Sequence, residues 1–318
     1  MSAESKPLAI CVMGPTASGK TDLALELIEE FPCEIISVDS GQVYRGMDIG
    51  TAKPDSEVLA RAPHRLIDIR DPDQAYSAGE FRRDALREMA EIERQGRIPL
   101  LVGGTMLYFK ALAQGMADLP QADVELRERL EALGAEKGWN VLHQRLSEID
   151  PEAAAQVHPN NPQRLVRALE VYELTGKPIS QHWREQKNKS ANQERLPFRL
   201  VNISIVPTDR TALHQRIETR FQQMVARGFV EEVQQLKLDP KLHRDLPAMR
   251  AVGYRQVWDY LDGQTNYAEM VQRGVIATRQ LAKRQLTWLR GWPDASPLDA
   301  LGSNLLGQAL KILHCTAK

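Results

Sequence analysis

No apolar run in this sequence approaches the roughly 20 residues that a membrane-spanning helix needs. The opening stretch, residues 1–6, is short and polar and lacks the apolar core of a signal peptide. Only three cysteines occur, Cys11, Cys33 and Cys315, and their odd number and wide spacing argue against a disulfide framework or a metal site. These absences predict a cytoplasmic protein with reduced thiols and no membrane segment.

The sequence also has little net charge. Its 318 residues carry a formal net charge of −1 at pH 7, and 42% of them are hydrophobic and 26% charged. This balance is ordinary for a globular protein and is unlike that of a chain that is basic throughout. A nucleic-acid partner would therefore have to meet a local basic patch. The length suits two domains, or one large α/β domain with an insertion.

The most specific pattern present is GPTASGKT at residues 14–21, which matches the phosphate-loop pattern G-x-x-x-x-G-K-[ST] at every fixed position. An apolar run at 8–13 predicts a strand before it, and 22–30 has helical spacing after it. In such a loop the backbone N–H groups and the helix N-terminus surround an anion. Lys20 is expected to reach the outer phosphates and the Thr21 hydroxyl to bind Mg²⁺, so the predicted ligand is a polyphosphate. The loop consists of Gly14, Pro15, Thr16, Ala17, Ser18, Gly19, Lys20 and Thr21.

Short apolar runs alternate with helical patterns in the first third of the chain. Further runs occur at 35–38, 66–69 and 98–102, and 78–95 has the pattern of a charged amphipathic helix. This alternation predicts an α/β fold whose core is a parallel sheet like that of the P-loop NTPases, with helices on both faces.

The middle of the chain shows helical periodicity only, apart from a polar stretch at 187–194 that predicts a loop. A strand pattern returns at 199–206. We therefore predict a core domain made of 1–118 and 198–318, interrupted by an α-helical insertion domain at 119–197. Helices are expected at 123–134, 139–149, 162–175 and from 211 to about 292, and no clear pattern follows 293.

A second candidate site follows the run at 35–38. Ligands bind outside the carboxyl ends of the strands in open α/β sheets, so Asp39 is expected beside the phosphate loop. Three roles stay open for its carboxylate: a partner of Mg²⁺, a base or hydrogen-bond acceptor that faces an acceptor substrate, or a cap of the next turn.

A third candidate site, Gly103-Gly104-Thr105, follows the run at 98–102. Paired glycines at the end of a strand permit close approach of the backbone to a ligand. Thr105 is then either a donor to that ligand or the N-cap of the next helix.

Cationic side chains gather on two predicted helices. Arg164 and Arg167 share one side of the first, close to its N-terminus, where positive charge opposes the helix dipole. This placement indicates phosphate contact, with a solvated face as the alternative. Residues 278–290 contain Arg279 and Lys283 four positions apart and no acidic residue, which makes them the best candidate for a nucleic-acid patch.

Taken together, these segments resemble the bacterial tRNA dimethylallyltransferase (isopentenyltransferase) family. The resemblance runs from about residue 8 to 292 and is highly specific in combination, whereas a phosphate loop alone occurs in many unrelated NTPases. Its motifs are GPTASGKT at 14–21, DSxQxY at 39–44 with the RGMDIGTAKP that follows, VGGTMLY at 102–108, NPQRLVRALEVYELTGKP at 161–178, AVGYRQ at 251–256 and AKRQLTWLR at 282–290.

The resemblance implies transfer of the dimethylallyl group from dimethylallyl diphosphate to N6 of the adenine just 3′ of the tRNA anticodon, position 37. We expect a monomer that uses Mg²⁺ held at Thr21. The implied catalytic residues are Thr16, Lys20, Asp39 and Arg220, with diphosphate or nucleotide bound by 14–21. The implied contacts to the tRNA anticodon stem-loop are Asp39, Ser40, Gly41, Gln42, Thr105, Gln163, Arg164, Leu165, Val166, Arg167, Arg279 and Lys283.

Two other functions stay open at this point. A small-molecule kinase would use ATP in the phosphate loop and Asp39 as the base on an acceptor hydroxyl, but it would need neither the basic 278–290 segment nor a large helical insertion. An RNA-binding protein switched by a nucleotide would have no transfer chemistry, and its function would survive Asp39→Ala.

Overall fold

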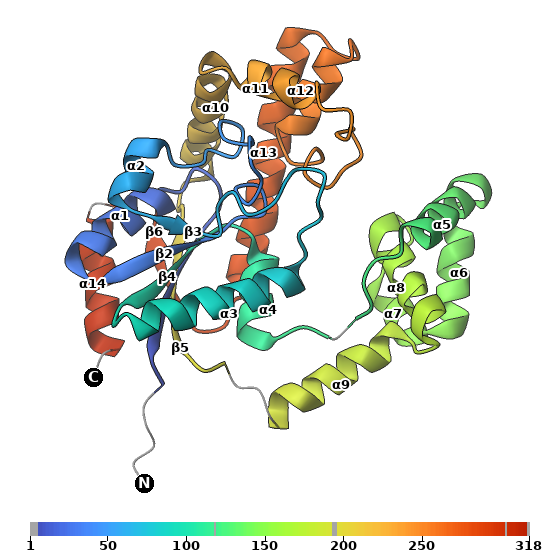
Figure 1. The fold of residues 1–318 in the computed structure, drawn as a ribbon, viewed down its shortest axis with the longest axis horizontal. Helices are drawn as coiled ribbons and strands as arrows, with labels where there is room; N and C mark the ends of the chain where they lie inside the picture. Colours follow the sequence, from blue (N-terminus) through green and yellow to red (C-terminus); the bar gives the residue numbers. More distant parts are fainter. Residues whose placement is uncertain (1–5, 118, 193–195, 303, 317–318) are drawn as a thin grey trace. The chain divides into compact units, whose positions relative to one another are not determined.

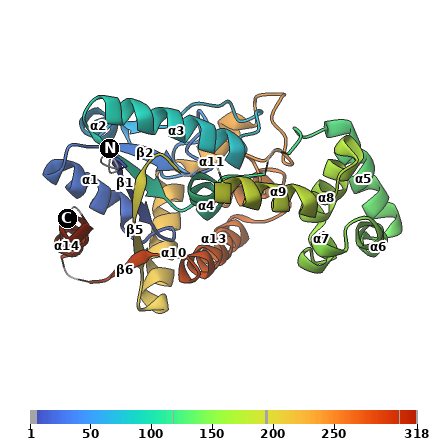
Figure 2. The ribbon, with the colours of Figure 1, turned by 90° about the horizontal axis from the view of Figure 1, so that it is seen from below.

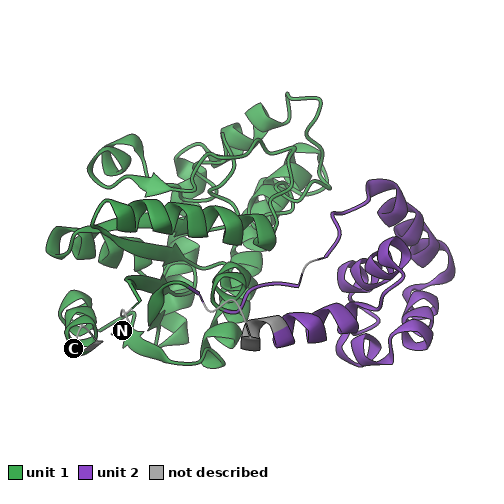
Figure 3. Cartoon of the chain, turned by 60° about the horizontal axis from the view of Figure 1, so that its bottom comes forward, with its two compact units in different colours: residues 1–113, 197–318 green, residues 114–196 purple. Residues whose placement is uncertain are grey.

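The structure is a computed structural model, and it describes residues 6–117, 119–192, 196–302 and 304–316. Its described part forms two compact units, Met1–Ala113 with Pro197–Lys318, and Gln114–Leu196 (Figure 3). The first unit is the α/β core and the second is wholly helical. The sequence placed the helical insertion at 119–197, a few residues from this division.

A six-stranded parallel sheet forms the centre of the first unit (Figure 1). Its order is β3-β2-β4-β1-β5-β6, so the strand before the phosphate loop lies between β4 and β5. Because helices cover both faces of such a sheet, its strands are nearly continuous apolar runs. The strands are β1 (Leu8–Met13), β2 (Cys33–Val38), β3 (His64–Arg65), β4 (Ile98–Gly103), β5 (Arg199–Val206) and β6 (Ala295–Asp299).

The register of the sheet aligns the carboxyl ends of its central strands. Met13 of β1 and Val38 of β2 both pair with Gly103 of β4. The residues that follow these strands therefore emerge together at one edge, which is where ligands bind in parallel sheets. This register brings the phosphate loop, Asp39 and Thr105 to one place.

Two helices cover one face of the sheet, α1 (Lys20–Glu30) and α14 (Leu305–Thr316), which lie side by side (Figures 1 and 2). Alternate residues of the strands, such as Ile10 and Ile203, pack with Leu27 of α1 and Leu313 of α14 in one buried cluster. The other helices of the first unit are α2 (Ser56–Arg61), α3 (Ala78–Arg94), α4 (Met106–Gln114), α10 (Arg210–Ala226), α11 (Phe229–Leu236), α12 (Tyr254–Leu261) and α13 (Tyr267–Arg290).

The second unit has its own apolar core, which includes Leu130, Leu142, Leu146 and Leu165. Its helices are α5 (Val124–Lys137), α6 (Trp139–Ile149), α7 (Pro151–Gln156), α8 (Pro162–Thr175) and α9 (Ile179–Asn192). The sequence signals at α8 are realised: the Asn161 side chain caps its first turn, and Gly176 ends it with a left-handed backbone at φ 69°.

Three expectations about secondary structure were wrong. The polar stretch at 187–194 is not a loop throughout, because α9 continues to Asn192; residues 193–195 lie outside the described residues. The tail beyond 293 forms β6 and α14. The run at 66–69 is not a strand, because β3 ends at Arg65 and Leu66 and Asp68 have positive φ.

The run at 66–69 leaves the sheet because polar groups outside it hold the chain. The Lys53 ammonium contacts the carboxylates of both Asp68 and Asp48 at 2.5 Å, and its side chain is only 4% exposed. The Ile69 backbone N–H donates to Val43 O rather than to β2. The apolar pattern alone therefore predicted a strand where the chain has already left the sheet.

No helix of the described residues is long and apolar enough to span a membrane.

Candidate active site

A cavity of about 790 Å³ opens at the carboxyl edge of the sheet, within the first unit. This volume lies in the range of small-molecule sites. Residues 16–22 line it together with residues that follow β2 and β4 and with side chains of α10 and α13. Segments far apart in the chain thus share one cavity.

The phosphate loop has the backbone of an anion site. Ala17 has φ 62° and Gly19 has φ 87°, so left-handed residues alternate along the loop and its N–H groups can converge. Helix α1 begins at Lys20, and no side chain caps its N-terminus. Its first N–H groups are therefore available to an anion. Gly14 and Pro15 are buried and do not line the cavity.

Two cations face the loop. Lys20 donates from its ammonium to Pro15 O at 2.6 Å. Burial, with the Arg220 guanidinium nearby, lowers the pKa of Lys20 to about 7, although Asp39 acts in the opposite direction. Arg220 comes from α10, and burial lowers its pKa too, against the opposing effect of Asp39 and Asp22. Two cations held close together repel each other, so a polyphosphate bound between them would stabilise the site.

The Asp39 carboxylate has one oxygen engaged in a turn. Its Oδ1 accepts hydrogen bonds from Gly41 N at 2.8 Å and Gln42 N at 3.3 Å. The side chain is partly exposed and lines the cavity. One of the roles left open by the sequence, the turn cap, is thus correct for Oδ1. That same cap fixes the direction of Oδ2, which accepts no hydrogen bond from the residues that the structure describes and can face a ligand.

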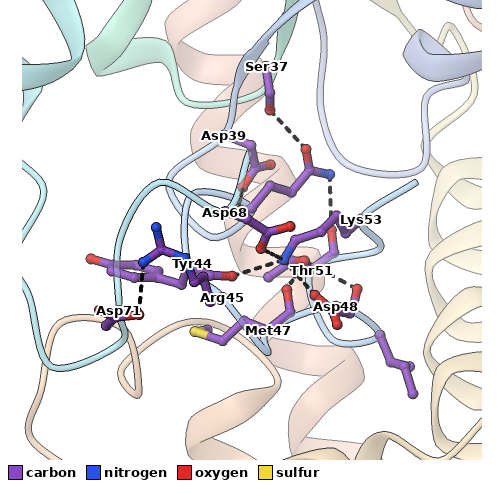
Figure 4. A network of polar contacts seen from close by, with 12 residues as sticks. Ser37, Asp39, Tyr44, Arg45, Met47, Asp48, Thr51, Lys53, Asp68 and Asp71 are labelled. Carbon is purple, nitrogen blue, oxygen red and sulfur yellow. Dashed lines mark hydrogen bonds and ion pairs between the residues drawn. The ribbon is translucent and has the colours of Figure 1, made fainter. Parts of the chain in front are cut away.

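A polar network supports the wall beside Asp39 (Figure 4). Gln42 Oε1 accepts from Ser37 Oγ at 2.8 Å, and Gln42 Nε2 donates to Ala52 O at 3.3 Å. Thr51 and Ala52 also line the cavity, as do Ser40 and Gly41. Gln42 is therefore held between β2 and the 51–52 backbone, with both ends of its amide satisfied.

The segment 48–50 leading to that wall is anchored by Glu232 of α11. Glu232 Oε2 accepts from Asp48 N at 3.0 Å and Ile49 N at 2.6 Å, and Oε1 accepts from Gly50 N at 3.1 Å. The Tyr254 hydroxyl also donates to Oε1. Burial and the neighbouring Glu232 raise the pKa of Tyr254, so its hydroxyl stays a donor.

We expect Glu232→Gln to destabilise the protein by about 1.5–3 kcal/mol. The substitution removes the charge that accepts these hydrogen bonds, and the new amide N–H₂ group faces the backbone N–H groups of 48–50, to which it cannot bond. Hydrogen exchange at Asp48, Ile49 and Gly50 should accelerate. Glu231→Gln is the matched control, since Glu231 is exposed on the same turn. Unchanged stability and unchanged exchange at 48–50 would contradict the anchoring role.

Gly103, the last residue of β4, and Gly104 both line the cavity, and they also serve packing. A Cβ on Gly103 would lie 2.0 Å from Val38 O, so this glycine lets β2 and β4 close together. A Cβ on Gly104 would lie 2.3 Å from Gln285 Nε2. Thr105 lines the cavity, and its Oγ1 accepts from Ser40 N at 3.0 Å, which ties the ends of β2 and β4 together.

The structure places the predicted basic residues of α13 differently. Arg279 is paired with Glu218 of α10 at 2.8 Å, so its charge is compensated within the protein. Lys283 is exposed, and neither residue lines the cavity. Arg284, another cation of the predicted basic segment 278–290, does line the cavity, and so does Gln285, which sequence reasoning did not name as a site residue. The motif AKRQLTWLR contained Gln285, but no local signal distinguished it from its neighbours.

The predicted contacts at 163–167 lie in the second unit and need correction. Leu165 and Val166 are buried in its core, so their side chains cannot contact RNA. Arg167 donates to the buried carboxylate of Glu170 at 2.6 Å and to Pro120 O at 2.7 Å, so it serves internal structure. Gln163 and Arg164 are exposed. Of the five residues predicted here to contact RNA, these two have side chains that can do so.

The chain matches the family model described as "IPP transferase" over residues 42–292. The structure is similar to the tRNA isopentenylpyrophosphate transferase of Bacillus halodurans, with 38% identity, TM-score 0.70, and 98% of this chain and 96% of that chain covered. It is also similar to the tRNA isopentenylpyrophosphate transferase of Staphylococcus epidermidis, with 33% identity and TM-score 0.70, and with 98% of this chain and 100% of that chain covered.

A eukaryotic dimethylallyltransferase that acts on tRNA is also similar, with 26% identity and TM-score 0.80, covering 98% of this chain and 79% of that one. The family match and two relatives at or above 33% identity confirm the predicted resemblance and the predicted enzyme class. With a phosphate loop, an Asp39 carboxylate and paired cations around one cavity, the chain belongs to the IPP transferase family.

Proposed function

We propose that this protein transfers a dimethylallyl group from dimethylallyl diphosphate to N6 of adenine 37 in tRNA, giving N6-(dimethylallyl)adenosine and diphosphate. The observation that carries the proposal is the single cavity in which the phosphate loop and the Asp39 carboxylate meet. The phosphate loop can bind the diphosphate of the prenyl donor, and the neighbouring carboxylate can accept a hydrogen bond from the amine that receives the prenyl group. Family membership supports the same reaction.

The phosphate loop stabilises the leaving group in this reaction. As the allylic C–O bond breaks, negative charge grows on the diphosphate, and the loop N–H groups, Lys20 and Arg220 lie where that charge develops. Thr16 belongs to the same loop and lines the cavity. The diphosphate departs with the electron pair of the broken bond, and the carbon chain bonds to N6.

Asp39 aligns the acceptor. The adenine amine is a weak nucleophile, because its lone pair is delocalised into the ring. Since Oδ1 is held by the turn, Oδ2 can accept one N6–H hydrogen bond and direct the nitrogen toward the allylic carbon. Once alkylated, the nitrogen is acidic, and its proton passes to Asp39. The adenine must leave its stack to reach the cavity, at a cost of a few kcal/mol.

The oxygen donors at this edge fit Mg²⁺. Thr21, the second residue of α1, lines the cavity, and so do Asp39 and Asp22. Mg²⁺ prefers oxygen ligands and typically binds through one or two protein groups together with substrate phosphates. The Thr21 hydroxyl would hold the ion, which when bound neutralises part of the diphosphate charge.

We propose tRNA as the partner through its anticodon stem-loop. Ser40, Gly41, Gln42 and Thr105 line the cavity beside Asp39, and Arg284 and Trp288 add a cation and an aromatic ring to its wall. Unstacked bases are recognised in this way by stacking and by contacts to their edges. Exposed Lys283, Gln163 and Arg164 are proposed to contact the RNA outside the cavity.

Incubation with unmodified tRNA, Mg²⁺ and dimethylallyl diphosphate tests the proposal. The RNA mass should rise by one five-carbon unit located at adenine 37, with release of diphosphate. If ATP is consumed and no prenyl group appears, the kinase alternative holds instead. If tRNA binds but no group is transferred with either donor, the protein is an RNA-binding protein without transfer chemistry.

A further inference from the structure

The Gln285 side chain bridges two loops that border the cavity. It lies on α13, and its amide is buried, with 8% of the residue exposed. Gln285 Oε1 accepts from the backbone N–H of Thr16 at 3.0 Å, and Nε2 donates to Gly104 O at 2.9 Å. One side chain thus joins the phosphate loop to the residues that follow β4.

Only a primary amide suits this position. The Thr16 N–H needs an acceptor and Gly104 O needs a donor, and glutamine supplies one of each on a single planar group. Gly104 has no side chain where Gln285 passes, since a Cβ there would lie 2.3 Å from Nε2. The space left by Gly104 and the length of Gln285 are therefore matched.

The bridge acts at a strained point of the phosphate loop. Thr16 directly precedes Ala17, whose φ of 62° is a left-handed conformation that costs a non-glycine residue about 1–2 kcal/mol. Such a conformation persists only where the surroundings over-determine it. Ala17 also packs on the cluster of Leu213, Ile217 and Ala282 between α10 and α13. Gln285 and this cluster together hold the loop against its local preference.

A second observation marks the loop as prepared for a ligand. The Ser18 hydroxyl is buried and has no hydrogen-bond partner among the described residues. It lines the cavity one residue after Ala17. A buried hydroxyl without a partner is unfavourable unless a ligand supplies one. The conformation of residues 16–18 thus carries an energetic cost in the free protein.

We propose that Gln285 is a positioning residue that holds the phosphate loop in its diphosphate-binding conformation through Thr16. This inference rests on the proposed function, since it assigns Gln285 a role in binding the diphosphate of the donor. Gln285 acts through the backbone of the loop and does not itself touch the diphosphate.

Calorimetric titration with inorganic pyrophosphate tests the role without tRNA. We expect Gln285→Ala to raise the Kd for pyrophosphate about tenfold, the size of one lost buried hydrogen-bond bridge. Amide exchange at Thr16 should accelerate to a similar extent, while tRNA affinity stays near wild type. Gln280→Ala, an exposed glutamine on the same helix, is the matched control and should change none of these.

Gly104→Ala provides a second, independent variant, because its methyl group would displace the Gln285 amide. It should raise the pyrophosphate Kd by a similar factor. The double variant should bind no more weakly than either single one, since both remove the same bridge. Wild-type affinity in Gln285→Ala, or fully multiplicative effects in the double variant, would overturn the inference. Failure of the wild-type protein to bind pyrophosphate would instead refute the proposed function.

Discussion

Replacing Asp39 with asparagine is expected to lower kcat for prenyl transfer by about 10²–10⁴-fold, the usual contribution of a general base. The substitution separates the two functions of this side chain. The asparagine oxygen can still accept from Gly41 N and Gln42 N, so the turn is kept. The amide nitrogen then faces the cavity, where it donates rather than accepts and cannot take a proton from N6.

Single-turnover measurements with prenylated-RNA detection give the chemical step directly, and filter binding gives the tRNA affinity. The affinity should change little, because the turn and its neighbours are preserved. Asp55→Asn is the matched control, since Asp55 also caps through one oxygen, accepting from Val58 N at 2.9 Å, and does not line the cavity. If Asp39→Asn retained more than a tenth of the wild-type rate, Asp39 would be a turn cap only.

The position of the site was predictable because it depends on strand ends. Each apolar run of the central strands could be recognised locally, and a parallel sheet brings the ends of those runs to one edge. Asp39 was therefore expected beside the phosphate loop, and the register of β1, β2 and β4 brings both of them, with Thr105, to one edge.

The contacts that could not be predicted join residues distant in sequence. Arg279 looked like a free cation because Glu218 lies 61 positions earlier. Gln285 carried no signal because its partner Thr16 is 269 positions away. The packing role of the glycines at 103 and 104 could not be predicted, because neither the strand nor the amide that approaches them is visible locally. Short-range pattern identifies the groups that bear the chemistry, while the groups that hold them in place come from the fold.

The cation at Lys20 is expected to make donor binding depend on pH. The pKa of Lys20 is lowered to about 7 in the free protein, chiefly by burial. A bound diphosphate favours the charged ammonium, so the pKa rises on binding and the complex takes up a proton. Affinity for dimethylallyl diphosphate should therefore be constant below pH 7 and fall about tenfold per pH unit above it, until the pKa of the complex is reached.

Calorimetry of the diphosphate in buffers of different ionisation enthalpy measures this proton directly. We expect uptake of about half a proton at pH 7 and close to one at pH 8. Lys20→Arg should abolish the uptake, because a guanidinium stays protonated throughout this range. Lys20→Met should lower kcat/KM by about 10²–10³-fold, the cost of losing one group that stabilises developing charge. A pH-independent affinity with no proton uptake in the wild-type protein would show that Lys20 is already charged before the donor arrives, and that Arg220 and burial do not set its protonation state.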